Sequence, residues 1–391
     1  MLKEIVKVIY APHKAFKEIT QNPKYLGPIL IMILFIAANF ALSYTLLSKT
    51  YIDKTEPEEP SKNFDLWTEE KSYWSSTAKI EVNTDDFING SYYGNKSIEF
   101  QLTSSSQIFM ELNITEGLSC LGPEGYKNLT FRVKIVEPAD IPSNASLYLI
   151  SDGQGSFYKN ISNVVNVTNA WNNVTLSLGN GWEQLGSPNW NNITCLRLEF
   201  TWPNNYNIKL LIDGLFFHGL YKSQMETSSN LLIDLVNPYS PINAFIQFTI
   251  QWVFLGGLLY LIPKVFGAKT VWRPLLIAAG FILMIYFVRT VVFAIVYAVA
   301  PDVYLPLAYL GGVSNEWRKA YEQIYQAFAF PYMVLWSFDK FIWIWAIALC
   351  TILFRSLDIL PWRTSIFSAV SSFILYLLLL ILFTPAPPIL L

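Results

Sequence analysis

The sequence predicts a membrane protein of mixed class, in which a bundle of five transmembrane helices carries an inserted extracytoplasmic β-sandwich of the jelly-roll type. Three observations support this. Hydrophobic residues make up 53% of the 391 residues and charged residues only 14%, against ~25% charged residues in soluble domains. Five segments are long and apolar enough to cross a bilayer. Between the first two lies a polar block, residues 49–237, whose composition differs from that of its flanks.

Residues 1–26 are basic, with five lysines against two glutamates. Apolar residues such as Ile5 and Val8 recur at helical spacing. Pro12 is a favourable first-turn residue for a second helix that runs to the break at Pro23. The pattern is typical of an interfacial segment held on the inner leaflet by apolar burial and anionic lipid. A basic flank that only sets the topology is the alternative.

Residues 27–48 form the first predicted span. The stretch contains about twenty residues without a charge, which matches the ~30 Å hydrocarbon core of a bilayer. Residues 49–62 are charged and contain Pro57 and Pro60, so we expect an extended linker here.

Residues 63–237 are predicted to form the β-sandwich, because short runs in this block alternate between apolar and polar residues with period two. Clear examples lie at 131–135, 196–201 and 208–213. About eight strands without a helical pattern favour two packed sheets. Further strands are expected at 97–103, 107–114, 146–151 and 171–178.

All nine Asn-x-Ser/Thr sequons lie in this block. An oligosaccharyltransferase reaches a sequon only outside the cytoplasm, so their confinement indicates a glycosylated ectodomain. A compositional accident is the alternative. Residues 49–237 carry 13 Lys or Arg and 22 Asp or Glu, a net charge of −9, which does not suggest a nucleic-acid partner. The sequons begin at Asn89, Asn95, Asn113, Asn128, Asn144, Asn160, Asn166, Asn173 and Asn192.

Cys120 and Cys195 both lie in the predicted ectodomain, whereas Cys350 lies in a predicted span. In an oxidising compartment the first two are expected to form a disulfide. Closing a loop of about 75 residues would stabilise the fold by roughly 4 kcal/mol in the chain-entropy model. Two buried free thiols are the alternative.

Four aromatic residues near predicted loops are candidate glycan contacts, because sugars stack on aromatic faces: Trp182, Trp190, Trp202 and Tyr206. Large aromatics also fill sandwich cores, and this second role stays open. Asp213 before Gly214 is a candidate metal ligand or a structural turn residue. The sequence shows no His/Cys metal spacing, nucleophile elbow or phosphate-binding glycine loop, so we predict no catalytic residue, metal or cofactor.

Three stretches carry a family resemblance: Gly94 to Phe100, Trp171 at the start of a strand, and Ile208 to Phe217 as the last strand. They resemble carbohydrate-binding modules of the galactose-binding-like sandwich type, over most of residues 72–219. The resemblance implies a jelly-roll fold and a glycan as ligand.

Four more spans are predicted beyond the polar block. The cytoplasmic side would hold residues 1–26 and two short loops with ten Lys or Arg in all, against two in the loop 301–330. The positive-inside rule therefore places the amino terminus in the cytoplasm and both residues 49–237 and the carboxyl terminus outside. The spans are expected at 245–265, 274–300, 331–354 and 366–383.

Arg289 lies inside the third predicted span, and Asp339 and Lys340 lie inside the fourth. At 1.5 Å per residue, Arg289 is about 16 Å and Asp339 about 12 Å below the same membrane surface. Charges at such depth usually pair inside the bundle. Arg289 is therefore predicted to pair with Asp339, while Lys340 turns elsewhere or snorkels. A role in fixing helix register is favoured over a proton relay.

A short motif precedes the first span: Ala11-Pro12, Phe16, Lys17, Ile19, Asn22-Pro23 and Gly27-Pro28. It resembles the Yip family, named for interaction with Ypt/Rab-type GTPases, and in particular its prokaryotic and archaeal branch. The resemblance covers residues 1–48 and 238–391 and makes the sandwich an insert between the first two spans. Eukaryotic members act in vesicle traffic and membrane shaping, but the segments tied to GTPase binding have no clear match here.

The leading functional hypothesis is a non-enzymatic protein of the cell envelope. Its base would lie in the lipid bilayer and its sandwich would bind a glycan or an envelope protein. The alternative is a small-solute permease or transporter subunit, for which the spans offer few polar residues. A glycosidase is a third reading, although no pair of carboxylates stands out.

Overall fold

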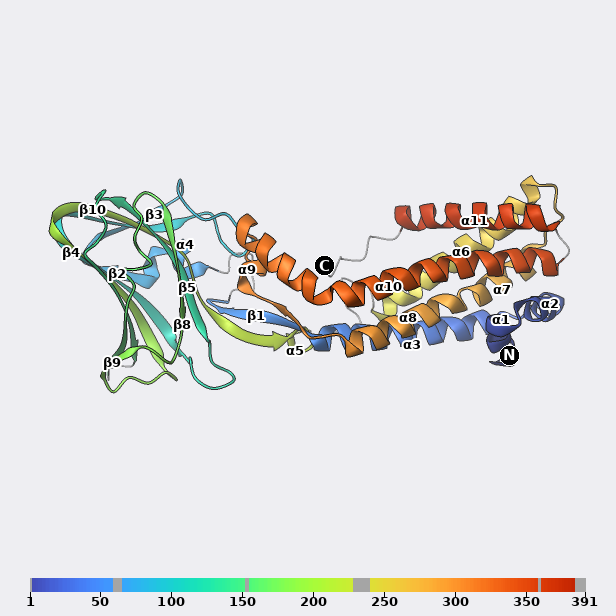
Figure 1. Ribbon diagram of the computed structural model, residues 1–391, viewed down its shortest axis with the longest axis horizontal. Coiled ribbons are helices and arrows are strands. Elements are labelled where there is room, and N and C mark those ends of the chain that lie inside the picture. The colour runs from blue at the N-terminus through green and yellow to red at the C-terminus, as the bar shows by residue number, and fades with distance from the viewer. Residues whose placement is uncertain (1, 59–64, 152–154, 228–239, 358–359, 384–391) are drawn as a thin grey trace. The chain divides into compact units, whose positions relative to one another are not determined.

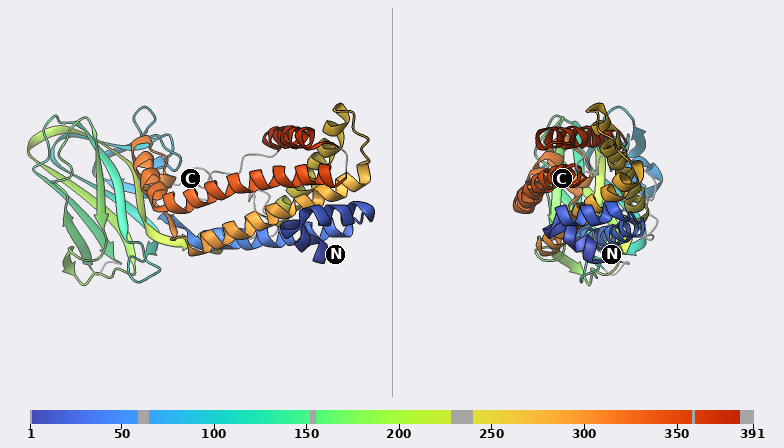
Figure 2. Two further views of the ribbon diagram at one scale, coloured as in Figure 1. Left: turned by 45° about the vertical axis from the view of Figure 1, so that its right-hand side comes forward. Right: turned by 90° about the vertical axis from the view of Figure 1, so that its right-hand side faces the viewer.

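The structure is a computed structural model that describes residues 2–58, 65–151, 155–227, 240–357 and 360–383. The chain divides into two compact units. The helical unit comprises Met1–Thr50, Ser223–Val303 and Tyr325–Leu391. The sandwich unit comprises Tyr51–Lys222 and Tyr304–Ile324. Figures 1 and 2 show long helices side by side in the first unit and curved strands in the second.

Five helical segments of the described chain are long and apolar enough to cross a membrane: α3 (Leu26–Lys49), α6 (Pro241–Val265), α7 with α8 (Trp272–Ile282 and Met284–Val299), α10 (Ser314–Ser356) and α11 (Trp362–Phe383). They correspond to the five predicted spans. The basic segment forms α1 (Leu2–Tyr10) and α2 (Pro12–Gln21), with Pro12 in the first turn as expected. A short helix α5 (Gln224–Thr227) follows the sandwich.

Helix α10 differs from the prediction, because it begins at Ser314 and not near Pro331. Residues 314–330, expected as part of a loop, are rich in Glu, Gln, Ala and Lys, which favour helix. Pro331 lies inside the helix. The first residues of α10 belong to the sandwich unit.

The sandwich unit is built from antiparallel strands around two long ones, β4 (Ser97–Leu118) and β10 (Ile193–Ser223). Register shifts between Thr201 and Ile208 bend β10, so each long strand contributes to both sheets (Figure 1). The remaining strands are β1 (Thr50–Glu56), β2 (Trp74–Ser76), β3 (Lys79–Asn83), β5 (Asn128–Glu137), β6 (Asn144–Ser151), β7 (Gly155–Asn160), β8 (Trp171–Ser177), β9 (Glu183–Gly186) and β11 (Val303–Leu305).

The first sheet has the strand order β2-β4-β10-β6-β7-β9 and uses the second half of β4 and the first half of β10. The second sheet has the order β3-β4-β10-β5-β8 and uses their other halves. Short helices α4 (Leu66–Glu69), η1 (Lys71–Tyr73) and α9 (Leu307–Leu310) complete the unit.

Both sheets bury one face in a single apolar core. In β10, for example, Leu196, Leu198 and Phe200 are 0% exposed, while Arg197 and Glu199 between them face outward and are half-buried. Period-two alternation in the sequence is thus realised as core and surface. The two stretches expected as separate strands at 97–103 and 107–114 join in β4.

Two predicted boundaries need correction. The stretch expected as a linker, residues 49–62, contains β1, which adds to the sheet in the order β11-β1-β10. Its last residues fall in 59–64, outside the described residues. The first segment of the sandwich unit ends at Lys222 rather than at residue 237, and Tyr304–Ile324 form its second segment. Residues 228–239 also lie outside the described chain.

Candidate functional site

The outward face of the first sheet carries a line of polar and aromatic side chains that crosses all six strands. Antiparallel register places these residues directly opposite one another on successive strands. At ~4.8 Å between strands, the line is about 24 Å long. We call it the cross-strand row; it consists of Ser75, Glu111, Arg197, Tyr148, Tyr158 and Glu183.

Arg197 stands in the middle of this row. Its Nε donates to Glu111 Oε1 at 2.5 Å, and its Nη1 lies 3.5 Å from Glu199 Oε1. Its guanidinium also lies 5.7 Å from the ring centroid of Phe109. Burial by itself would lower the pKa of Arg197, but the hydrogen bond and charge of Glu111 raise it. The row therefore holds a permanently charged donor that two carboxylates orient.

Tyr148 and Tyr158 form the aromatic part of the row. Their ring centroids are 5.2 Å apart and the rings are tilted by 46°. Both side chains are half-buried. Burial, with the charge of Glu199 nearby, raises the pKa of Tyr148, so its hydroxyl stays a neutral donor at physiological pH. Two aromatic faces beside fixed donors and acceptors can hold a sugar chain by stacking and hydrogen bonds.

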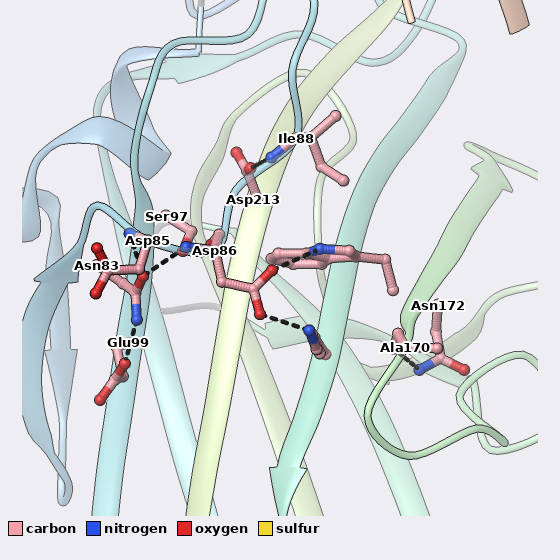
Figure 3. Close-up of polar contacts among 11 residues, drawn as sticks. Asn83, Asp85, Asp86, Ile88, Ser97, Glu99, Ala170, Asn172 and Asp213 are labelled. Atoms are coloured by element: carbon pink, nitrogen blue, oxygen red, sulfur yellow. Dashed lines mark hydrogen bonds and ion pairs between the residues drawn. The ribbon is translucent and has the colours of Figure 1, made fainter. Parts of the chain in front are cut away.

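A loop of the chain itself makes polar contacts with the outward face of the second sheet (Figure 3). The loop after β3 lies over it, and the Asp86 carboxylate accepts from Lys134 Nζ at 2.5 Å and from Trp171 Nε1 at 3.2 Å. Asn83 Oδ1 accepts the Asp86 amide at 2.9 Å. This loop therefore occupies part of the face.

Asp213 has a structural role in the same region. Its carboxylate accepts the Ile88 amide and the Gly214 amide, both at 2.6 Å, and the Thr68 hydroxyl at 3.3 Å. Burial raises its pKa to about 8 and that of neighbouring Asp65 to about 6. In the described part of the chain, no group of three or more His, Cys, Asp or Glu side chains could hold a metal ion.

The four aromatic residues expected to contact glycan lie in or against the core. Trp182 and Trp202 are 8% and 1% exposed. Trp190 stacks on Phe157 with ring centroids 3.7 Å apart, and Tyr206 packs at the core edge with its hydroxyl donating to Asp140 Oδ2 at 2.8 Å. All four therefore pack against protein, and a glycan contact by the half-buried Trp190 and Tyr206 stays a prediction.

The cross-strand row was not identified from the sequence. Tyr148 alternates with core residues in the expected strand at 146–151, which indicates that it faces outward, whereas the strand that carries Tyr158, β7, was not among the expected strands. Their alignment with Arg197 depends on the register of β10 against β6, which local sequence does not reveal.

Cys120 and Cys195 are free in the structure, so the predicted disulfide is absent. Cys120 is 4% exposed and packs in the core. Cys195 precedes the core residue Leu196 and faces outward with Arg197, and it is half-buried. The two thiols lie on opposite faces of the first sheet, which prevents them from meeting.

Six of the nine sequon asparagines are exposed, and Asn128, Asn144 and Asn192 are half-buried. Asn113 and Asn160 lie on the outward face of the first sheet, on either side of the cross-strand row. They pair with Cys195 and Ser146, the residues two positions before Arg197 and Tyr148. Whether any sequon carries a glycan stays a prediction.

In the helical unit, Arg289 and Asp339 are paired as the sequence predicts. Arg289 donates from Nε to Asp339 Oδ1 at 2.5 Å and from Nη2 to Oδ2 at 3.1 Å. Lys340 turns away and lies 4.8 and 4.2 Å from the ring centroids of Trp336 and Trp343. The bidentate geometry joins α8 to α10.

No family model and no curated protein matches the sequence. Among solved structures, part of the chain is similar to a family 11 carbohydrate-binding module from Clostridium thermocellum in complex with a β-1,3-1,4-mixed-linked tetrasaccharide. The identity is 13% and the TM-score 0.27, over 37% of this chain and 88% of that chain.

A family 30 carbohydrate-binding module from Clostridium thermocellum matches at 14% identity and a TM-score of 0.28, over 39% and 91% of the two chains. A xylan-binding domain from Paenibacillus barcinonensis matches at 13% and 0.25, over 39% and 88%. These three neighbours are carbohydrate-binding β-sandwiches. The Yip resemblance stays a prediction.

Proposed function

We propose that this is a non-enzymatic membrane protein of the cell envelope. A Yip-like base of five helices anchors the sandwich unit, which binds a glycan along the cross-strand row. The row is the observation that carries the proposal. It joins two half-buried tyrosine rings to an oriented guanidinium and to carboxylates that accept hydroxyl protons.

A glycan suits this surface better than an apolar protein partner does. Protein interfaces are depleted in charge at their centre, whereas Arg197, Glu111 and Glu199 lie in or beside the middle of the row. A sugar hydroxyl can donate to a carboxylate and accept from a guanidinium at the same time. Protein recognition on this face remains the competing outcome of the test below.

The membrane role has its own support. The helical unit exposes large apolar side chains on several helices, among them Ile344 at 68%, Ile381 at 76% and Leu382 at 76%. Lipid is the solvent that such a surface requires. The charge bias of the loops supports a location of the sandwich outside the cell. Mass spectrometry of the native protein should find glycans at several of the nine sequons, and nine bare sequons would count against this topology.

Binding is tested on the full chain in lipid nanodiscs, because residues 304–324 belong to the sandwich unit. The protein is screened against a glycan array, in glycosylated form and after enzymatic removal of N-glycans. The best oligosaccharide is then titrated by calorimetry. Arg197→Ala and Tyr148→Ala should each weaken binding by roughly tenfold or more, which corresponds to the loss of one or two good contacts.

Arg318→Ala is the matched control. It removes the same charge from an exposed position on α10 and should leave the affinity unchanged. The bound oligosaccharide should be recovered intact, whereas its cleavage would contradict the non-enzymatic part of the proposal. Glycan binding at this row would be rejected if array binding survives both row substitutions. It would also be rejected if the row binds a protein partner and no glycan.

A further inference from the structure

The helical unit contains a group of buried polar atoms that have no hydrogen-bond partner among the described residues. Other hydroxyls in the same helices are satisfied by the carbonyl four residues earlier. Thr290 of α8 donates to Tyr286 O at 3.0 Å and Thr249 of α6 to Phe245 O at 2.8 Å. The unsatisfied atoms are Gln251 Oε1, Tyr286 OH, Ser368 Oγ, Ser372 Oγ and Tyr376 OH.

Three of these residues come from different helices at a similar depth. Gln251 lies 14 residues before the end of α6, and Tyr286 and Tyr376 lie 14 residues after the starts of α7 and α11. At 1.5 Å per residue, each is about 21 Å from the end of its segment that the sequence places on the cytoplasmic side. Helix α11 packs against α6. The three side chains therefore occupy one level of the bundle.

Helix α11 carries further polar side chains between this level and its amino-terminal end. Ser368, Ser372 and Tyr376 recur at spacings of four, which puts them on one face of the helix. All three are 0% exposed, and Gln251 is 4% exposed. The hydroxyls of Tyr286 and Tyr376 are close enough to interact, but they make no hydrogen bond of ordinary geometry.

The charge around these atoms is balanced. Arg289 and Asp339 both act on Tyr286, and they neutralise each other as an ion pair. The remaining groups are phenols, alcohols, an amide and the buried thiol of Cys350, which are uncharged and can donate or accept. An ion would find no net counter-charge here, whereas a small neutral molecule with hydroxyl groups could satisfy several of these atoms at once.

We propose that Gln251, Tyr286, Ser372 and Tyr376 line an internal site for small uncharged hydrogen-bonding molecules. Water is the simplest occupant, and a short polyol is the alternative of the same chemistry. Burying this many polar groups without partners is unfavourable, and an occupant removes that cost. The site is independent of glycan binding by the sandwich and gives the helical unit a role beyond anchoring.

The first test compares hydroxyl removals by thermal unfolding of the full chain in nanodiscs. If an occupant bonds the hydroxyls, Ser372→Ala and Tyr376→Phe should each lower the unfolding midpoint by about 2–4 °C. Ser371→Ala is the control, because it changes the same residue type at the neighbouring, half-exposed position of α11. A midpoint that is unchanged or raised in both variants overturns the proposal, since removal of a dry unsatisfied hydroxyl is not destabilising.

The second test separates the two occupants. Glycerol is titrated against the wild type and against Ser372→Ala with Tyr376→Phe. A saturable stabilisation that only the wild type shows identifies a polyol, and equal effects on both proteins identify water. An experimental density map should then show ordered density within hydrogen-bond distance of Tyr376 OH and Ser372 Oγ. Empty space there, or serines bonded to helix carbonyls, overturns the proposal. Glycan binding should be unaffected in these variants.

Discussion

Arg132 of β5 holds Glu316 of α10 with Nη2 at 2.8 Å from both carboxylate oxygens. The Arg132 side chain is 4% exposed, and its guanidinium also lies 4.6 Å from the ring centroid of Tyr93. Asn173 donates to the same carboxylate at 3.3 Å. The first turns of α10, which the sequence predicts as part of a loop, thus complete the sandwich unit.

The first prediction concerns this contact. Glu316→Gln should destabilise the packing of residues 304–316 by about 1–3 kcal/mol, because it leaves a buried arginine without its counter-charge. Hydrogen exchange of the full chain should show faster exchange in this segment. Glu322→Gln, an exposed change on the same helix, is the control. Equal protection in the two variants would show that the ion pair contributes little.

A second prediction concerns Arg289 and Asp339. Asp339→Ala should destabilise the helical unit more than the double change Arg289→Leu with Asp339→Leu, by about 2–3 kcal/mol. The single change leaves a charge without a partner between α8 and α10, whereas the double change removes both charges. Thermal unfolding in nanodiscs measures the difference. A double variant at least as damaged as the single one would argue that the pair does more than balance charge.

The third prediction concerns pH. The pKa of Asp213 is raised to about 8 in the folded state, from 3.8 as the ordinary value. Between these values the folded state binds a proton that the unfolded state has lost. Stability of the sandwich unit should therefore fall as the pH rises from 5 to 8, with a slope of up to about 1.4 kcal/mol per pH unit.

Unfolding of wild type and Asp213→Asn across this pH range checks that slope. The variant cannot titrate at this position, so its pH dependence should be flatter even if its overall stability is lower. Asp65, with a pKa raised to about 6, should leave a residual slope at the acidic end. Parallel curves for the two proteins would exclude Asp213 as the source.

The fourth prediction concerns the ectodomain thiols. Burial raises the pKa of Cys120 to about 12 and that of Cys195 to about 11, so both stay protonated near pH 8 and react slowly with iodoacetamide. After denaturation without reductant, both should be labelled fully. If peptide mapping instead finds Cys120 linked to Cys195, the predicted disulfide exists. That result would contradict the position of Cys195 on the outward face of the sheet.

Local periodicity in the sequence determined which segments form helices and which form strands. Apolar runs predict the five long helices, and period-two alternation predicts the strands, because burial of one face imposes those patterns. The contact between Arg289 and Asp339 could also be predicted from the sequence, because the rise per residue of a helix converts sequence position into depth below the membrane surface.

The tertiary structure decided the rest. The cross-strand row exists because β10 aligns Arg197 with Glu111 on one side and with Tyr148 on the other. The same pairing places Cys195 on the face away from Cys120. Register between distant strands, and the level at which helices from distant segments meet, are set by how the whole core packs, and no local stretch of sequence contains that information.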